Sequence, residues 1–259
     1  MRYFLELSYN GGFFHGWQSQ PNANSVQATI EEALSNIVRE RISVTGAGRT
    51  DTGVHAHQMY AHFDINKPIE DEKKFLLSLN SLTGRYIAVK KLIKVFQKDH
   101  ARFDAVKRTY KYFITFKKNP FLKDFCWFSP SELNFDAMNA AAGILLQTSD
   151  FTSFAKLHSD VKTNICKVNE ALWNPISKDK EANDFLGSLN DGYVFTISAD
   201  RFLRNMVRSI VGTLIDVGRN KISYDNFQEI IMQKNRCAAG TSMPACGLFL
   251  WHVSYPFIT

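Results

Sequence analysis

The sequence is poor in the features that mark secreted, metal-binding and membrane proteins. It has only four cysteines among 259 residues, and they are too scattered for a C-x-x-C pair or a zinc-binding spacing. We therefore expect reduced, buried thiols. The first residues, M-R-Y-F-L-E, lack the layout of a signal peptide, and no apolar run is long enough to span a bilayer. These absences predict a cytoplasmic protein with no metal and no membrane association.

Two nucleotide-binding motifs are also missing, the P-loop and the dinucleotide fingerprint. What is present is a globular composition, with 45% apolar and 22% charged residues. The 31 basic residues outnumber the 25 acidic ones and give a net charge of +6. This charge permits a polyanionic partner without demonstrating one. The length allows one large domain or two of ordinary size.

The most informative segment is residues 46–56, which read G-A-G-R-T-D-T-G-V-H-A. Short apolar alternations at residues 42–44 and 61–65 flank it, so it is predicted to be a loop between two strands. Its glycines allow positive φ angles and close backbone approaches. Asp51 lies two positions from Arg49, and a neighbouring positive charge lowers the pKa of a carboxyl group. We therefore expect an ionised Asp51, suited to act as a nucleophile or general base.

Two other interpretations of this loop remain open. It can be a solvated turn with an incidental ion pair. Residues 51–53 also spell D-T-G, the tripeptide of aspartic proteases, whose chemistry needs two carboxylates that share one proton. Arg49 opposes protonation of Asp51, and the chain has no second Asp-Thr/Ser-Gly. A homodimer would supply the second carboxylate, so the protease interpretation stays open.

Residues 48–56 resemble the signature G-R-T-D-x-G-V-H-A/G of the tRNA pseudouridine synthase A (TruA) family. The resemblance recurs along nearly the whole chain, in an aromatic G-W-Q segment at 16–18, H-A-R-F at 100–103, R-x-Y-x-Y at 108–112, D-F-x-S-F at 150–154, R-F-L-x-x-M-V-R-x-I-V-G at 201–212, and A-G, P-A-x-G-L-x-L and Y-P between 239 and 256. It departs at Ser149, where a histidine is common. It also departs at residues 82–87, which read L-T-G-R-Y-I where the family usually has L-P-x-D-I.

The resemblance assigns roles to five residues. Asp51 is expected to act at the sugar as nucleophile or base, and the sequence leaves covalent and elimination routes open. Arg49 and Arg208 are expected to orient this carboxylate, and Arg49 also to fill the space that the base vacates. A base inside a stem must be flipped out before it can react. Tyr110 is then expected to stack on the flipped uracil, and Leu248 to help wall the pocket.

The activity that the resemblance implies is isomerisation of uridine to pseudouridine in the anticodon stem-loop of tRNA, at positions 38–40. The reaction involves no net redox change and no energy input, so no cofactor is expected. The family works as a homodimer, whose joined basic surface would grip the tRNA backbone. The alternative from another class is a non-catalytic RNA-binding protein. It would need a basic, aromatic sheet but neither Arg49 nor Asp51, and no RNP-type signature is present.

Interspersed strands and helices predict an α+β fold of two similar halves, each a mainly antiparallel sheet with helices packed on one face. The resemblance implies that they form a pseudouridine-synthase-type fold with a central active-site cleft. We expect residues 1–105 to form the half that carries the catalytic Asp loop. Residues 106–259 are expected to form the half that completes the active site and the tRNA cleft.

Periodicity also places individual elements. Strands are predicted at residues 3–9, 42–44, 61–65, 87–95, 110–116, 165–172 and 193–197, and helices at 26–37, 75–82, 135–145 and 206–214. Asn24 and Gln27 resemble a capping box for the first helix. Arg204 and Arg208 are expected to share one face of the last helix. The polar residues 177–192 are expected to be a loop.

Overall fold

A computed structural model describes residues 1–157, 162–186 and 192–258 of the chain. It divides into two compact units, the first made of Met1–Val106 with Phe249–Thr259 and the second of Lys107–Leu248. The last strand therefore belongs with the first unit, whereas the division made from the sequence kept residues 106–259 together. We call these parts unit 1 and unit 2.

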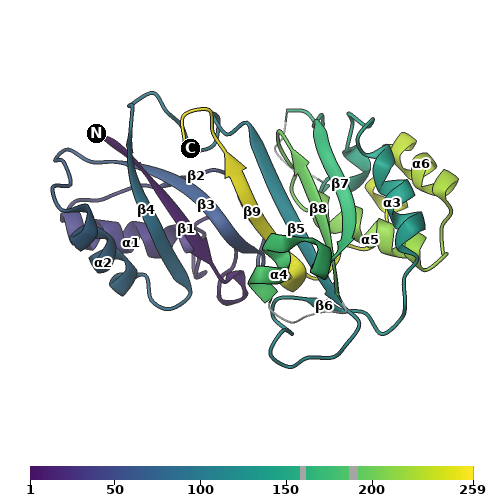
Figure 1. Ribbon diagram of the computed structural model, residues 1–259. Coiled ribbons are helices and arrows are strands. Elements are labelled where there is room, and N and C mark those ends of the chain that lie inside the picture. Colours follow the sequence, from purple (N-terminus) through teal and green to yellow (C-terminus); the bar gives the residue numbers. More distant parts are fainter. Residues whose placement is uncertain (158–161, 187–191, 259) are drawn as a thin grey trace. The chain divides into compact units, whose positions relative to one another are not determined.

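Unit 1 is built on a sheet whose strand order is β4-β1-β3-β9 (Figure 1). Its strands are β1 (Arg2–Tyr9), β2 (Thr45–Gly46), β3 (His55–Asp64), β4 (Ile87–Val95) and β9 (Leu248–Ser254). β1 is antiparallel to β3 and β4, so that Leu5 lies opposite Ala61 on one side and Leu92 on the other. β9 runs parallel to β3, with Phe249 opposite His55, and β2 pairs with β3.

Two helices pack on unit 1, α1 (Val26–Val38) and α2 (Glu72–Leu82). They contact each other, and α2 contacts β4. The predicted face of α1 is buried at its first three positions. The predicted cap was wrong, because the N-cap is Ser25, whose Oγ accepts a hydrogen bond from the amide of Ala28. The side chain of Gln27 instead holds the flanking chain, by bonds to the amide of Ser19 and the carbonyl of Val44.

Unit 2 has an antiparallel sheet of order β5-β8-β7, and a short strand β6 runs parallel to β5. The strands are β5 (Lys107–Thr115), β6 (Trp127–Phe128), β7 (Val168–Pro175) and β8 (Gly192–Ala199). The helices α3 (Phe135–Ile144), α5 (Met206–Gly218) and α6 (Tyr224–Met232) contact one another, and α3 lies on β7. The strands of both units are mainly antiparallel and helices pack on them, which confirms the α+β prediction.

Three local predictions were wrong. Ile42 and Val44 are buried, but residues 42–44 do not belong to a strand, because β2 covers only Thr45–Gly46. Arg204 does not share a helix face with Arg208, because it precedes the start of α5. The expected loop at 177–192 contains the helix α4 (Lys180–Leu186), and residues 187–191 of that loop lie outside the described residues.

The reason for α4 is a local cap. The carboxylate of Asp179 accepts a hydrogen bond from the amide of Ala182 at 3.0 Å, which satisfies a donor in the first helical turn. Ala182 is fully buried and anchors the short helix. Asp179 also pairs with the buried ammonium group of Lys111 at 2.7 Å, and this long-range contact was not visible in the sequence.

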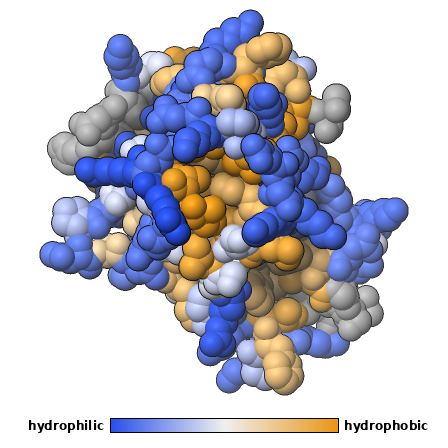
Figure 2. Space-filling view, turned by 90° about the vertical axis from the view of Figure 1, so that its left-hand side faces the viewer, coloured by the Kyte–Doolittle hydropathy of each residue, from blue (hydrophilic) through white to orange (hydrophobic). Residues whose placement is uncertain are grey.

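Across the described part of the chain, none of the helices combines the length and the apolar character needed to cross a membrane. Hydrophobic residues nevertheless reach the surface. Figure 2 shows a group of them near the centre of the face that it presents, surrounded by hydrophilic residues. A cluster of exposed apolar residues is a mark of an interaction site, whereas single exposed apolar residues are common on protein surfaces.

Candidate active site

Asp51 opens a tight turn immediately before β3. The amide of Val54 donates to the carbonyl oxygen of Asp51 at 3.1 Å. Gly53 lies inside the turn with φ +79°, a conformation that favours glycine. Asp51 is half-buried and Arg49 is exposed. The predicted loop therefore exists, and it carries both residues at the edge of unit 1.

Thr50 anchors the residue before the turn. Its Oγ1 lies 2.9 Å from the hydroxyl oxygen of Tyr9 on β1, and both residues are buried. Its carbonyl oxygen accepts a hydrogen bond from the amide of Trp17 at 3.1 Å. The backbone next to Asp51 is therefore held through a side chain and through the main chain.

Two glycines let residues 11–17 pack directly against the Asp51 turn. A Cβ atom at Gly11 would lie 2.0 Å from the carbonyl oxygen of Val54. At Gly16, which has φ +90°, a Cβ would lie 2.6 Å from the carbonyl oxygen of Thr50. The amide of Gly11 also donates to Nδ1 of His55 at 3.1 Å. The Gly-Trp-Gln segment thus supports the turn that carries the carboxylate.

In unit 2, Arg208 lies in the first turn of α5 and is bound to the segment that follows the last helix. Its Nε donates to the carbonyl oxygen of Met243 at 2.6 Å. In return, the amide of Met243 donates to the carbonyl oxygen of Arg208 at 3.1 Å. The segment approaches the helix closely, since a Cβ at Gly212 would lie 1.8 Å from the carbonyl oxygen of Thr241. These contacts orient the plane of the guanidinium group.

Tyr110 lies on β5 opposite Ile197 of β8. It is half-buried, whereas Tyr112, two residues further along the same strand face, is completely buried. The ring of Phe202 meets the Tyr110 ring edge to face, at 4.9 Å between centroids and 82° between planes. Tyr110 therefore packs against Phe202 but is not enclosed as a core residue would be.

Leu248 is buried, with 5% of its surface exposed. It follows Gly247, where a Cβ would lie 2.9 Å from the ring of Tyr112. The hydroxyl of Tyr112 donates to the carbonyl oxygen of Pro244 at 3.0 Å. Burial raises the pKa of Tyr112, so this hydroxyl stays protonated and can act as the donor. The contacts hold the segment that leads into Leu248 against β5.

The residues predicted for the site thus fall into two groups, Arg49 and Asp51 in unit 1 and Tyr110, Arg208 and Leu248 in unit 2. Sequence reasoning missed the residues that hold them, above all Thr50 and Met243. The alternation that places Tyr9 on a buried strand face was a usable signal for the contact with Thr50. No local pattern links Met243 to Arg208, because 35 residues separate them.

Comparison with known proteins identifies the class. A family model described as tRNA pseudouridine synthase matches residues 141–256. The mainly antiparallel α+β architecture agrees with this match, so the fold is that of a pseudouridine synthase.

Full-length relatives narrow the class to one family. The chain is 51% identical to tRNA pseudouridine synthase A of Parabacteroides distasonis, over 98% of this chain and 96% of the relative. It is 50% identical to the protein of the same name in Bacteroides fragilis, with the same coverage. The protein of that name in Bacillus subtilis is 38% identical over 98% of this chain and 99% of its own length. The chain belongs to the tRNA pseudouridine synthase A family.

Proposed function

We propose that this protein isomerises uridine to pseudouridine in the anticodon stem-loop of tRNA, at positions 38–40, and that Asp51 is the catalytic carboxylate. Membership of the family makes the protein an isomerase that modifies tRNA. The observation that carries the assignment of Asp51 is its place on a turn that is supported at both ends. On one side Tyr9 contacts Thr50, the residue before Asp51. On the other side Gly11 packs against the carbonyl group of Val54.

The reaction breaks the bond between N1 of uracil and C1′ of ribose, and it forms a bond between C5 and C1′. The proton on C5 is lost and N1 gains one, so atoms balance without an oxidant or a reductant. Asp51 acts at the sugar, either by forming a covalent bond or by taking a proton. A turn that is held before the substrate arrives needs little rearrangement during the reaction.

The remaining site residues take supporting roles in this proposal. Arg49 and Arg208 orient the carboxylate of Asp51, and Arg49 fills the space that the flipped base leaves. The bond from Arg208 Nε to Met243 supports a geometric role, because it fixes the plane of the guanidinium. Tyr110 stacks on the uracil with its half-exposed ring, and Leu248 forms part of the pocket wall.

The proposal extends to partners. The substrate is a polyanion, and the net charge of +6 favours its binding in a salt-dependent way. We further propose a cytoplasmic homodimer that needs no cofactor and does not associate with membranes. The isomerisation itself requires no cofactor, because it involves no net redox change.

The test is the release of tritium from tRNA labelled with [5-³H]uridine. We expect release from a tRNA with uridines at positions 38–40. We expect none from a matched tRNA that has cytidines at these positions and in which the bases that pair with them are replaced to keep the stem paired. A non-catalytic RNA-binding protein would bind both tRNAs without release. An aspartic protease would hydrolyse peptides, respond to pepstatin and release no tritium. Equal release from both tRNAs would contradict the proposed positions, and no release from either would contradict the activity.

A further inference from the structure

A stacked aromatic pair lies at the surface of unit 1. The rings of Phe13 and Tyr86 are 3.5 Å apart between centroids and inclined by 12°. The guanidinium carbon of Arg85 lies 5.8 Å from the centre of the Tyr86 ring. Phe13 keeps 49% of its surface exposed, and Arg85 is exposed as well. An aromatic surface and a cation are therefore presented together.

Hydrogen bonds hold this pair in place from both sides. The amide of Asn10 donates to the carbonyl oxygen of Tyr86 at 2.9 Å, and Oδ1 of Asn10 accepts from the amide of Gly12 at 3.0 Å. The carbonyl oxygen of Phe13 accepts from the side chain of Asn24 at 3.2 Å. A ligand that stacks on rings already fixed in this way does not have to order them first.

The turn that carries Phe13 touches the turn that carries Asp51. Phe13 ends the 3-10 turn η1 (Gly11–Phe13). A Cβ at Gly11 would lie 2.0 Å from the carbonyl oxygen of Val54, and the amide of Val54 closes the Asp51 turn. We therefore expect the nucleotides that flank a uridine bound at Asp51 to be the part of the tRNA that reaches the aromatic pair.

The second ring belongs to the turn at residues 82–87. These residues read L-T-G-R-Y-I. The segment here contains Arg85 and Tyr86 and no carboxylate, and it turns at Gly84 with φ +72°. An exposed arginine beside two stacked rings suits a polyanion that also carries flat aromatic groups, as an unpaired stretch of nucleic acid does.

We propose that Phe13, Tyr86 and Arg85 bind an unpaired nucleotide of the tRNA loop next to the uridine that is modified. The base stacks on the exposed face of Phe13, and Arg85 contacts a phosphate. Every nucleobase has a π face, so this contact adds affinity and register without reading sequence. Recognition of unpaired RNA bases by aromatic and guanidinium planes is the common solution for single-stranded loops. This inference rests on the proposed function.

The test uses anticodon stem-loop RNAs that carry 2-aminopurine at one unpaired position at a time. Stacking on an aromatic ring quenches its fluorescence. We expect the fluorescence to be quenched at one position when the RNA binds the Asp51→Asn protein. This variant is used because it should bind the RNA without modifying it. Phe13→Leu keeps an apolar side chain but removes the ring. It should abolish the quench and weaken binding about ten-fold at fixed salt, whereas Phe13→Trp should retain both. Arg85→Gln should lower the salt slope of binding by about one counterion.

Phe96 provides a matched control, since it is 75% exposed and Lys98 lies 5.9 Å from its ring centre. Phe96→Leu should leave quench and affinity unchanged. The proposal is overturned if Phe13→Leu binds like the parent protein at an equal melting temperature, or if Phe96→Leu causes the same loss. A Phe13→Leu variant that changes sedimentation but not RNA affinity also overturns it, and assigns the surface to a contact between protein chains.

Failure of the proposed function would look different. If the unsubstituted protein releases no tritium from tRNA but quenches one position through Phe13, the activity fails and the stacking site stands. If the protein releases tritium while Phe13→Leu has no effect on binding, only the stacking site fails.

Discussion

The hydroxyl oxygen of Tyr9 and Oγ1 of Thr50 lie 2.9 Å apart in the interior of unit 1, and Thr50 is the residue that precedes Asp51. The first strand of the sheet thus reaches the turn that carries Asp51 through a buried hydrogen bond between residues 41 positions apart. This bond holds the backbone next to the Asp51 carboxylate.

Tyr9→Phe should therefore lower both stability and turnover. The ring remains, but Thr50 loses its partner in a buried place, which costs about 1–3 kcal/mol. Thermal melts and single-turnover rates measure the two effects. Thr50→Val combined with Tyr9→Phe removes both polar groups and should recover much of the stability without recovering the rate. A Tyr9→Phe protein that melts and turns over normally would show that the bond does not position Asp51.

Asp51→Asn should fold normally, bind tRNA and make no pseudouridine. The substitution keeps size and shape and removes only the charge that we propose to act at the sugar. Tritium release measures the activity, and a gel-shift titration measures binding. Release at the normal rate would falsify the role of Asp51.

Arg208→Lys should lose activity although it keeps the positive charge. The Nε of Arg208 donates to the carbonyl oxygen of Met243 and so orients the planar group. Lysine has no second donor in a fixed plane to repeat this arrangement. Single-turnover assays at saturating tRNA separate the chemical step from binding. Full activity of the lysine variant would mean that only charge matters at this position.

Tyr110→Phe should turn over slowly at an unchanged melting temperature. Phenylalanine retains the half-exposed ring face for stacking but loses the hydroxyl, which in the proposed site lies near the base or the sugar. Tyr110→Ala removes the ring as well and should also weaken tRNA binding. If Tyr110 were a core residue, Tyr110→Phe would be silent and Tyr110→Ala would destabilise the fold by roughly 3–5 kcal/mol.

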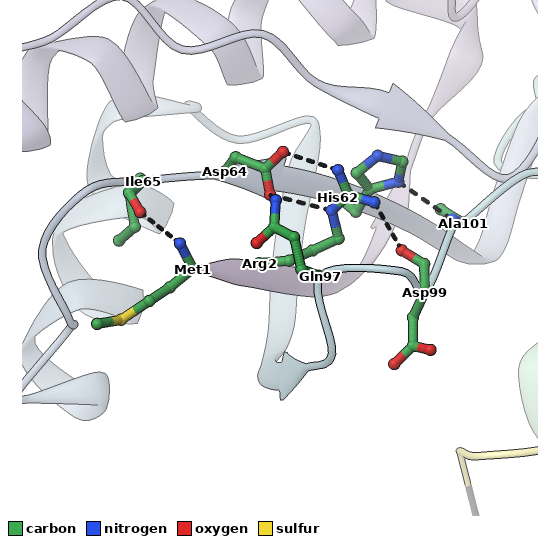
Figure 3. A network of polar contacts seen from close by, with 8 residues as sticks. All are labelled: Met1, Arg2, His62, Asp64, Ile65, Gln97, Asp99 and Ala101. Carbon is green, nitrogen blue, oxygen red and sulfur yellow. Dashed lines mark hydrogen bonds and ion pairs between the residues drawn. The ribbon is translucent and has the colours of Figure 1, made fainter.

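A network of polar contacts lies near the amino terminus and includes Arg2, His62 and Asp64 (Figure 3). Arg2 binds the carboxylate of Asp64 through two nitrogens, at 3.0 and 2.7 Å, and the carbonyl oxygen of Asp99 at 2.9 Å. Beside it, Nδ1 of the buried His62 accepts a hydrogen bond from the amide of Ala101 at 3.1 Å. An accepting Nδ1 requires the unprotonated ring.

Stability should fall as the pH drops below about 6.5. Burial lowers the pKa of His62 to about 4, and the charge of Arg2 acts in the same direction. Between these values the unfolded chain binds a proton that the folded chain does not, so the contribution is complete above pH 6.5 and declines toward pH 4. His62 accounts for up to about 3 kcal/mol, and His100, whose pKa burial also lowers, adds to it.

Denaturant titrations between pH 7 and 5 measure this slope. His62→Gln keeps an acceptor for the amide of Ala101 but does not titrate, so it should flatten the slope relative to the parent protein. Parallel slopes for the two proteins would show that His62 is not the titrating group. The carboxyl groups with lowered pKa values, such as Asp64, respond only at lower pH.

Much of the fold followed from local patterns. Alternating residues marked β1 and β4, and apolar residues at helical spacing marked α1, α3 and α5, because each of these elements buries one face. The pattern failed at residues 42–44. Their two apolar side chains are buried, as alternation indicated, but the backbone has no strand partner there. Burial alone does not make a strand.

The candidate site was only partly visible in the sequence. The loop with Arg49 and Asp51 was predicted from its glycines and its flanking apolar residues, and the resemblance to a family named the other three residues. What the sequence did not reveal is how these side chains are held. The anchor of Arg208 on Met243 and the stack of Phe13 on Tyr86 join distant parts of the chain.

By itself, the sequence determined the class of fold, the family and the carboxylate-bearing turn, because periodicity, composition and short motifs are local properties of the chain. Only the tertiary structure decided that Tyr9 holds Thr50, that Gly11 and Gly16 admit the neighbouring backbone, and that residues 249–259 complete unit 1. These features are contacts between segments tens of residues apart. They form only where packing brings complementary shapes and hydrogen-bonding groups together, and no local pattern in the sequence predicts these contacts.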